Sequence, residues 1–155
     1  MKTLVVYDSV FGNTEKVALE IGKNLGQPGE VRALRVGAVS HLTLEGVKLL
    51  VVGSPTRGFR PTEGVMRFLK GLPAGSLEGV KAAAFDTRID VSTIGSPILR
   101  SIVKRGGYAA PAIAKRLQRC GAQVPTPEGF IVEESEGPVR EGELARAGTW
   151  AKSLV

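Results

Sequence analysis

Short apolar runs alternate along this chain with longer stretches in which apolar residues recur every three or four positions. The runs predict buried β-strands, and the longer stretches predict amphipathic helices. The predicted strands span residues 2–7, 31–36, 47–52, 80–85 and 129–133. The predicted helices span residues 14–25, 62–72, 109–120 and 142–154, with a shorter one from Ser96 to about Arg105.

Residues that commonly begin or end helices support several of these boundaries. Gly26 follows the first helical stretch, Thr62 stands where an N-cap is expected, and Ser96 precedes a first-turn proline. The spacing also assigns helix faces. We expect an inward Cys120 in the helix over 109–120, acting as a small core residue.

The last helix has a predicted inward stripe at four positions three or four residues apart. The stripe consists of Leu144, Ala147, Ala151 and Leu154. Trp150 lies outside the stripe, so we expect it to pack at the surface.

Strands that alternate with helices and are apolar on both faces predict a parallel sheet with helices on both sides. The chain has 155 residues, of which 43% are hydrophobic and 23% charged, as in a globular protein. It contains no internal repeat or linker. We therefore expect residues 1–155 to form one α/β domain.

Composition excludes several classes of function. The single cysteine and single histidine rule out a disulfide framework and make histidine-based catalysis or a metal site unlikely candidates. The net charge is +6, but the charges are scattered and aromatics make up only 5%, which favours a solvated surface over a nucleic-acid site. No apolar run is long enough to cross a membrane, and Asp8 interrupts the first run too early for a secretory signal. We expect a cytoplasmic protein.

The first strand-to-helix loop carries the strongest candidate chemistry. Ligands of open α/β sheets bind beyond the carboxyl ends of the strands, and a helix N-terminus attracts phosphate. Gly12 allows close backbone approach, and Ser9, Asn13 and Thr14 add side-chain donors. The alternative is a tight turn capped by Asn13 or Thr14. The dinucleotide-binding and P-loop glycine patterns are absent from the strand-to-helix turns.

Residues 5–21 resemble the flavodoxin signature: two aliphatics, an aromatic, a hydroxyl residue, a small residue and a threonine, followed by an alanine and an aliphatic. Residues 53–56 (Gly-Ser-Pro-Thr) resemble the family's first flavin-flanking loop, and residues 130–144 resemble the C-terminal part of small family members. The resemblance implies a flavodoxin-like fold, a five-stranded parallel sheet in the order 2-1-3-4-5 with helices on both faces. It also implies noncovalent FMN.

The resemblance further implies which loops hold the cofactor. The first loop would bind the phosphate, residues 56–59 would line one edge of the flavin ring with a flexible peptide at Gly58, and residues 87–90 would meet its pyrimidine end. The implied cofactor-binding residues are Ser9, Val10, Phe11, Gly12, Asn13, Thr14, Pro55, Thr56, Arg57, Gly58, Phe59, Thr87, Arg88 and Asp90.

The chain departs from the family's pattern in its side chains. Val10 and Phe11 replace hydroxyl residues, so the affinity for phosphate would be lower; Phe11 would either shield the phosphate or pack on the loop. Residues 86–90 contain no aromatic. We expect Phe59 to stack on one face of the flavin and the other face to be aliphatic or open. Residues 96–108 would form either a flap over the third loop, which spans residues 86–95 after the fourth predicted strand, or a plain surface helix.

Charge is a second departure, because electron-carrier flavodoxins are acidic. Arg57, Arg60 and Arg88 fall in the predicted flavin-flanking loops. An arginine about 8 Å from an anion stabilises it by roughly 1 kcal/mol in a half-solvated medium, which for one electron is on the order of 40 mV. We expect a less negative potential for formation of the reduced anionic flavin. The alternative is that these arginines point into solvent and are screened.

Three functions fit these observations. The favoured one is an FMN-binding electron-transfer protein, monomeric or weakly self-associating, with a redox partner protein that is acidic, such as a ferredoxin or a reductase. The second is an FMN-dependent NAD(P)H:quinone-type oxidoreductase, in which the arginines hold nucleotide phosphates. The third is a flavin-free interaction or regulatory module. The missing third-loop aromatic favours the last two, whereas the intact phosphate loop opposes the third.

Overall fold

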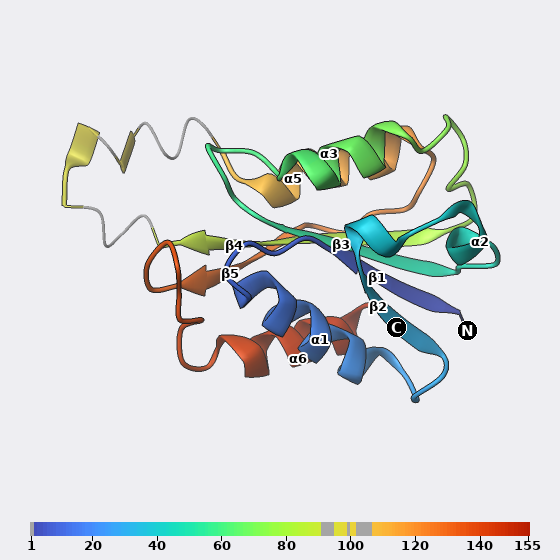
Figure 1. The fold of residues 1–155 in the computed structure, drawn as a ribbon, viewed down its shortest axis with the longest axis horizontal. Coiled ribbons are helices and arrows are strands. Elements are labelled where there is room, and N and C mark those ends of the chain that lie inside the picture. Colours follow the sequence, from blue (N-terminus) through green and yellow to red (C-terminus); the bar gives the residue numbers. More distant parts are fainter. Residues whose placement is uncertain (1, 91–94, 99, 102–106) are drawn as a thin grey trace.

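A five-stranded parallel sheet forms the centre of the molecule (Figure 1). The computed structural model describes residues 2–90, 95–98, 100–101 and 107–155. The sheet order is β2-β1-β3-β4-β5, which confirms the expected fold class. The strands are β1 (Thr3–Tyr7), β2 (Val31–Arg35), β3 (Leu49–Pro55), β4 (Lys81–Ile89) and β5 (Glu128–Val132).

The sequence of β3 explains its place at the centre of the sheet. Its first six residues are all buried, because helices cover both faces and a strand bonds to each edge. Val51 pairs with Val5 of β1 on one side and with Ala83 of β4 on the other. A strand with no polar face is stable only in such a position.

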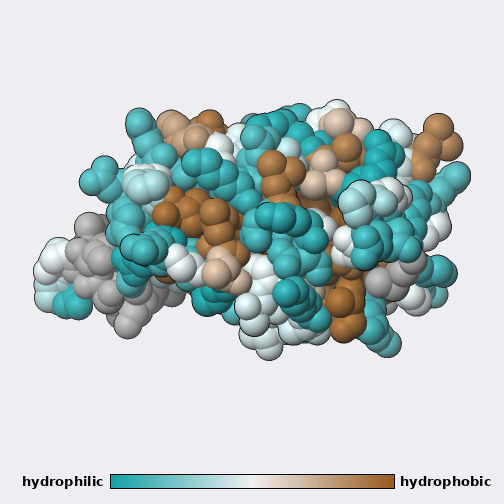
Figure 2. Space-filling view, turned by 90° about the horizontal axis from the view of Figure 1, so that it is seen from below, coloured by the Kyte–Doolittle hydropathy of each residue, from teal (hydrophilic) through white to brown (hydrophobic). Residues whose placement is uncertain are grey.

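Two pairs of helices cover the sheet (Figure 1). The first pair, α1 (Asn13–Leu25) and α6 (Glu143–Ser153), lies on one face. The second pair, α3 (Glu63–Lys70) and α5 (Ala109–Arg119), lies on the other. Figure 2 views the face of α1 and α6, where hydrophilic residues predominate and apolar patches are small and separated.

Two further elements, η1 (Val36–Ala38) and α2 (His41–Leu44), fill the connection from β2 to β3. The sequence analysis placed no element there, since a single turn is too short to show helical periodicity. Of the helix predicted from Ser96 to about Arg105, residues 99 and 102–106 lie outside the described part. The Arg100 amide donates to the Ser96 carbonyl at 3.0 Å, as in one helical turn.

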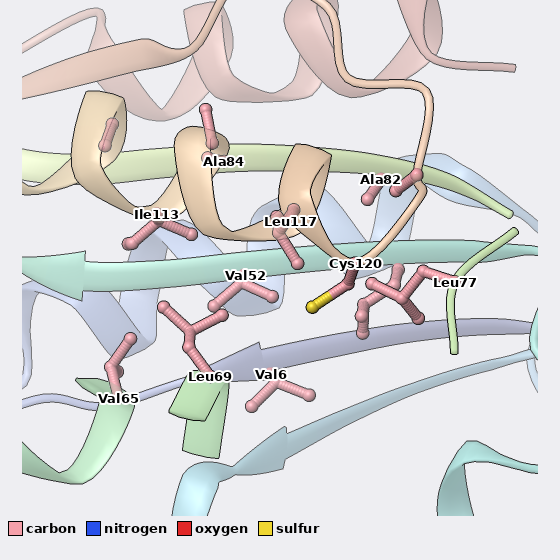
Figure 3. Packing of buried hydrophobic residues seen from close by; sticks show 14 of the residues in the cluster. Val6, Val52, Val65, Leu69, Leu77, Ala82, Ala84, Ile113, Leu117 and Cys120 are labelled. Carbon is pink, nitrogen blue, oxygen red and sulfur yellow. The ribbon is translucent and has the colours of Figure 1, made fainter. Parts of the chain in front are cut away.

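Aliphatic side chains fill the space between the sheet and the helices α3 and α5 (Figure 3). Val52 from β3, Leu69 from α3 and Leu117 from α5 are each at most 1% exposed. Cys120 is buried with them, which confirms its expected role as a core residue. The predicted N-cap of α3 is also confirmed, because the Thr62 hydroxyl accepts the Val65 amide.

The opposite face carries an aromatic cluster. Phe85, Phe130 and Trp150 meet edge to face, with ring centroids 5.9–6.3 Å apart. The expectation that Trp150 packs at the surface is therefore wrong in part, because the residue is half-buried and its ring packs against the core. Its ring is large enough to reach the sheet from the flank of α6. Phe85 in turn lies against the backbone of Gly53, where any Cβ would stand only 2.0 Å from the ring.

One position of the predicted stripe on α6 is also wrong. Leu144 is 36% exposed, whereas Ala147 and Ala151 are fully buried. Glu143 takes the inward position instead, because its carboxylate accepts the Ile131 amide at 2.7 Å and bonds to Arg146. A hydrogen-bonded acid thus replaces an aliphatic residue where α6 begins.

Candidate functional site

A small pocket of about 80 Å³ lies where β1, β3 and β4 end, and we call it the site pocket. Its lining residues are Ser9, Val10, Phe11, Asn13, Thr14, Pro55, Thr56, Arg57, Thr87, Arg88, Ile89, Val132 and Ser135. The structure therefore brings together ten of the residues implied by the resemblance. Gly12, Gly58, Phe59 and Asp90 do not line it.

Two lining residues, Val132 and Ser135, were missed by the sequence analysis, whereas Ile89 falls within the implied residues 87–90. Ile89 belongs to β4, which extends beyond its predicted end at Phe85. Val132 ends β5, and Ser135 follows it. A signal existed for them: β5 is the parallel neighbour of β4, so its carboxyl end reaches the same edge of the sheet.

The backbone of the β1–α1 loop offers unused hydrogen-bond donors. Gly12 adopts a left-handed conformation (φ 94°) and caps α1. In the part of the chain that the structure describes, the amides of Val10, Phe11, Asn13 and Thr14 donate to no other group. All four residues line the site pocket. Free N–H groups at the N-terminus of a 13-residue helix suit an anion.

The side chains expected to bind phosphate hold the loop together in this structure. The Ser9 hydroxyl accepts the Gly12 amide at 3.1 Å and the Glu15 amide at 3.4 Å. Asn13 donates to the Glu136 carbonyl at 3.0 Å, and the hydroxyls of Thr14 and Thr87 lie 2.8 Å apart. The free donors therefore belong mainly to the backbone.

Arg35, at the end of β2, anchors the loop from the edge of the sheet. Its guanidinium donates to the Ser9 carbonyl at 2.9 Å and pairs with Glu15 at 3.0 Å. The Tyr7 hydroxyl donates to the same carboxylate at 2.8 Å. Burial, followed by this bond to Glu15, raises the pKa of Tyr7. The sequence analysis missed Arg35, because β2 is distant from the loop in sequence.

A second anchor connects the loop with α3. The Thr62 hydroxyl donates to Asp8 at 2.6 Å while it accepts the Val65 amide. The Thr62 amide donates to the Ser54 hydroxyl at 3.0 Å. One threonine thus joins the ends of β1 and β3 to the first turn of α3.

The segment after β3 forms a tight hairpin turn. Arg57 and Arg60 exchange two backbone hydrogen bonds of 2.9 and 3.2 Å. Gly58 and Phe59 between them both have positive φ, 55° and 68°, as in a two-residue type I′ turn. Phe59 is the only non-glycine residue with positive φ in the described ranges. It is 40% exposed, and its stacking on a flavin stays a prediction.

Phe11 and Arg57 meet across the site pocket. The guanidinium carbon lies 5.6 Å from the centroid of the phenyl ring. The ring therefore contacts the neighbouring loop rather than the core, and it is 47% exposed. Arg57 and Arg60 form no ion pair with any described acidic residue.

Arg88 differs from both expectations for it. It lies on β4 rather than in a loop, and its guanidinium bonds to both carboxylate oxygens of Asp86 at 2.7 Å. Asp86 is fully buried, and it also accepts the Ala110 amide at 2.8 Å. Burial raises the pKa of Asp86, and the adjacent Arg88 opposes that shift. Arg88 is thus neither an unpaired cation near the pocket nor a solvated one.

Tyr108 packs against β4, whose residues 86–90 contain no aromatic, but it does not line the site pocket. Its ring centroid lies 3.7 Å from the Arg88 guanidinium. On β5, a Cβ at Gly129 would lie 2.2 Å from the same side chain. Arg88 is therefore confined between Tyr108 and Gly129, in addition to its bonds with Asp86. The sequence analysis missed this contact of Tyr108, because the tyrosine and Arg88 are distant in sequence and meet only in the folded chain.

Asp90, the last of the implied residues, pairs with Arg140 at 2.9 Å, and Arg140 also bonds to Glu133. These bonds to Glu133 and Asp90 raise the pKa of Arg140. Residues 91–94 of the predicted third loop, and Lys104 and Arg105 of the predicted flap, lie outside the described residues. No described helix has the length and apolarity needed to cross a membrane.

Comparison with solved structures identifies the architecture. A flavodoxin from the domain Archaea has a TM-score of 0.77 and 22% identity, covering 99% of this chain and 96% of its own. Oxidised flavodoxin 1 from Bacillus cereus has a TM-score of 0.75 and 17% identity, covering 99% and 97%. The flavodiiron protein from Giardia intestinalis has a TM-score of 0.72 and 22% identity, covering 99% and 35%. No family model and no curated protein sequence matches. The chain has the flavodoxin-like fold.

Proposed function

We propose that this chain with a flavodoxin-like fold binds FMN at the site pocket and passes electrons to and from a redox partner protein. The observation that carries the proposal is the set of four free backbone amides at the start of α1, all belonging to residues that line the pocket. Flavodoxins from several sources share the fold, which supports the choice of ligand.

The residues present fit the cofactor. The amides of Val10, Phe11, Asn13 and Thr14 would hold the phosphate, and Gly12 leaves room for it, because no atom lies within 4 Å of its absent Cβ. The pocket of about 80 Å³ takes only part of the cofactor. The exposed rim at Arg57 and Phe59 would bind the ring. Bound FMN supplies electron-transfer chemistry, while the chain binds and orients it.

Phosphate recognition gives a direct test. Val10→Glu places a negative charge beside the free amides, and Val10→Gln is the neutral control of similar size. We expect the first to weaken FMN binding at least 10-fold relative to the second, measured by quenching of flavin fluorescence. Riboflavin, which lacks the phosphate, should bind both variants similarly. Equal FMN affinity for the two variants would place the phosphate elsewhere.

Arg57 and Arg60 form no ion pair with an acidic residue in the described part of the chain, which favours testing a second function. In an NAD(P)H:quinone-type oxidoreductase these cations would hold nucleotide phosphates. NADPH that bleaches the flavin-loaded protein without another reductase would favour this enzyme. Bleaching only in the presence of a reductase or reduced ferredoxin would favour the carrier. If the purified protein takes up no flavin, the remaining candidate is the flavin-free interaction or regulatory module.

A further inference from the structure

We infer that four cations beside the site pocket form a docking surface for the acidic face of a redox protein. The cations are Arg57 and Arg60 of the hairpin turn, with Arg67 and Lys70 of α3; together we call them the basic rim. This inference rests on the proposed electron-transfer function and names the face that the partner uses.

The basic rim surrounds a shallow hollow of about 540 Å³. The hollow contains one carboxylate, Glu63, against four cations. None of the four is ion-paired with an acidic residue in the part of the chain that the structure describes. The charge of this surface is therefore available to a partner.

The arginines on the other flanks of the site are different. Arg35 pairs with Glu15, and Arg88 with Asp86. Arg140 pairs with Asp90 and Glu133, while Arg146 pairs with Glu128 and Glu143. Each of these four cations has an acidic partner, whereas the described arginines on the side of α3 have none among the described residues.

Exposed apolar residues stand next to the basic rim. Phe59 lies in the turn between Arg57 and Arg60, and Phe11 contacts Arg57. Val10 and Ile89 are exposed as well and line the adjoining pocket. An apolar centre with a charged border is the usual composition of a protein interface. Complementary charge across such a border speeds encounter.

The arrangement favours a protein over a small anion. The cations do not converge on one point: two lie in the turn, and two lie in the last turn of α3. All four are exposed, so none offers the buried donor of a built phosphate site. Arg57 lines both hollows, which places a docked partner beside the proposed flavin. An acidic protein surface matches this spread of charge.

The test compares two double variants with the same change in net charge. Arg67→Gln with Lys70→Gln removes two cations from the last turn of α3. Arg116→Gln with Arg119→Gln removes two cations from the last turn of α5, outside the hollow. The probe is reduced plant-type [2Fe–2S] ferredoxin, an acidic protein. In each encounter one electron leaves its cluster and one enters the bound FMN.

Stopped-flow absorbance gives the second-order rate constant at low and high salt. We expect the α3 variant to slow reduction 5- to 10-fold at 20 mM NaCl and the α5 control less than 2-fold. The rates should converge at 0.5 M NaCl, where charges are screened within a few ångströms. Equal slowing of the two variants, or loss that persists at high salt, would overturn the docking surface.

Two further measurements separate this inference from the cofactor proposal. FMN affinity should be unchanged in both variants, because neither alters a lining residue of the site pocket. Calorimetric titration of flavin-free protein with oxidised ferredoxin measures docking alone and should show at least 5-fold weaker binding for the α3 variant. Because this titration uses flavin-free protein, it tests the docking surface even if the chain binds no FMN. Binding equal to that of the control would reject the basic rim.

Discussion

The ion pair of Asp86 and Arg88 contributes to the stability of the fold only while both side chains are present. Removing one partner of a buried ion pair costs much more than the pair itself contributes, because the other charge stays desolvated. Here Arg88 is also confined by Tyr108 and Gly129, so it cannot easily turn into solvent. The pair therefore holds the end of β4 against α5 and β5.

Asp86→Asn tests that role. We expect the free energy of unfolding to fall by about 2–4 kcal/mol, because Arg88 loses its counter-ion in a partly buried place. The control is Glu133→Gln, which removes an exposed partner of Arg140 and should cost less than about 1 kcal/mol. Urea denaturation at pH 7 measures both. Similar small losses would show that Arg88 relaxes into water.

Arg57→Gln and Arg60→Gln test the electrostatic prediction for the flavin. Each should lower the potential for forming the reduced anionic cofactor by roughly 10–40 mV, since an unpaired cation near the ring stabilises added negative charge. Arg116→Gln on α5 is the control. Potentiometry on FMN-loaded protein at 50 mM salt measures this potential in each variant. A change no greater than in the control would mean that solvent screens both arginines.

Residue roles followed from the sequence where a side chain acts on its own neighbours. Thr62 as an N-cap needs only local spacing, and it was predicted. The partner of Arg88 was missed because the predicted strand ended at Phe85, which left Asp86 in a loop. On a strand, residues 86 and 88 lie on the same face, so a longer strand brings their side chains together.

At the scale of elements, the start of α3 is a junction. Thr62 caps the helix, donates its hydroxyl to Asp8 after β1, and donates its amide to the Ser54 hydroxyl of β3. The hairpin turn and the β1–α1 loop are thus held relative to one another by hydrogen bonds outside the site pocket.

Replacing Thr62 probes this junction. Thr62→Ala should destabilise the protein by about 1–2 kcal/mol through loss of the cap and of the bond to Asp8. Thr62→Ser keeps the hydroxyl and should lose less than half as much. Thermal unfolding compares them. We expect the alanine variant to bind FMN more weakly, and an alanine variant as stable as the serine variant would contradict the prediction.

At the start of α6, Glu143 makes the free energy of unfolding depend on pH. The Arg146 side chain, and then the Ile131 amide, hold the pKa of Glu143 below its usual value, while burial opposes them. A lowered carboxylate pKa contributes stability above about pH 4.3, the usual unfolded value, and that stability is lost as pH falls through the folded pKa. Glu143→Gln should cost about 1–2 kcal/mol at pH 7.

The difference between wild type and Glu143→Gln should shrink below about pH 4.3. Urea titrations between pH 3 and 7 measure it. Glu20→Gln, which removes a partner of Lys23 on the surface of α1, serves as the control and should cost little at pH 7. A Glu143→Gln loss that stays constant with pH would show that packing of the residue matters more than its charge.

Element types followed from hydrophobic periodicity, but their ends and faces did not always. β3 and β4 continue past their apolar runs into Pro55 and Ile89, because the backbone bonds between neighbours persist. Glu143 took the inward position assigned to Leu144, since a backbone amide and an arginine satisfy its carboxylate. A hydropathy pattern does not show that hydrogen bonds from the rest of the fold will allow a carboxylate to be buried.

For the whole molecule, the alternation of strands and helices predicted the fold. The sheet order rested on the resemblance to flavodoxins, and the structure confirms it. The meeting of three loops at one edge of the sheet was foreseen, and a pocket lies there. The ion pairs around that edge were not, because each joins residues that only the folded chain brings together.

Ligand binding should also act on the whole molecule. FMN at 100 times its dissociation constant should raise the free energy of unfolding by about 2.7 kcal/mol, which for a chain of this size is roughly 5–10 °C in Tm. Riboflavin at the same concentration should give a smaller shift. Circular dichroism melts measure both. Equal shifts would argue against recognition of the phosphate.

Gly129 has a consequence for the descent of this protein. The Arg88 side chain occupies the space of its missing Cβ, while Asp86 supplies the opposite charge. A residue larger than glycine at 129 is compatible only with a smaller side chain at 88, and then the acid at 86 loses its partner. Positions 86, 88 and 129 should therefore change together among homologous sequences, although more than forty residues separate the first from the last.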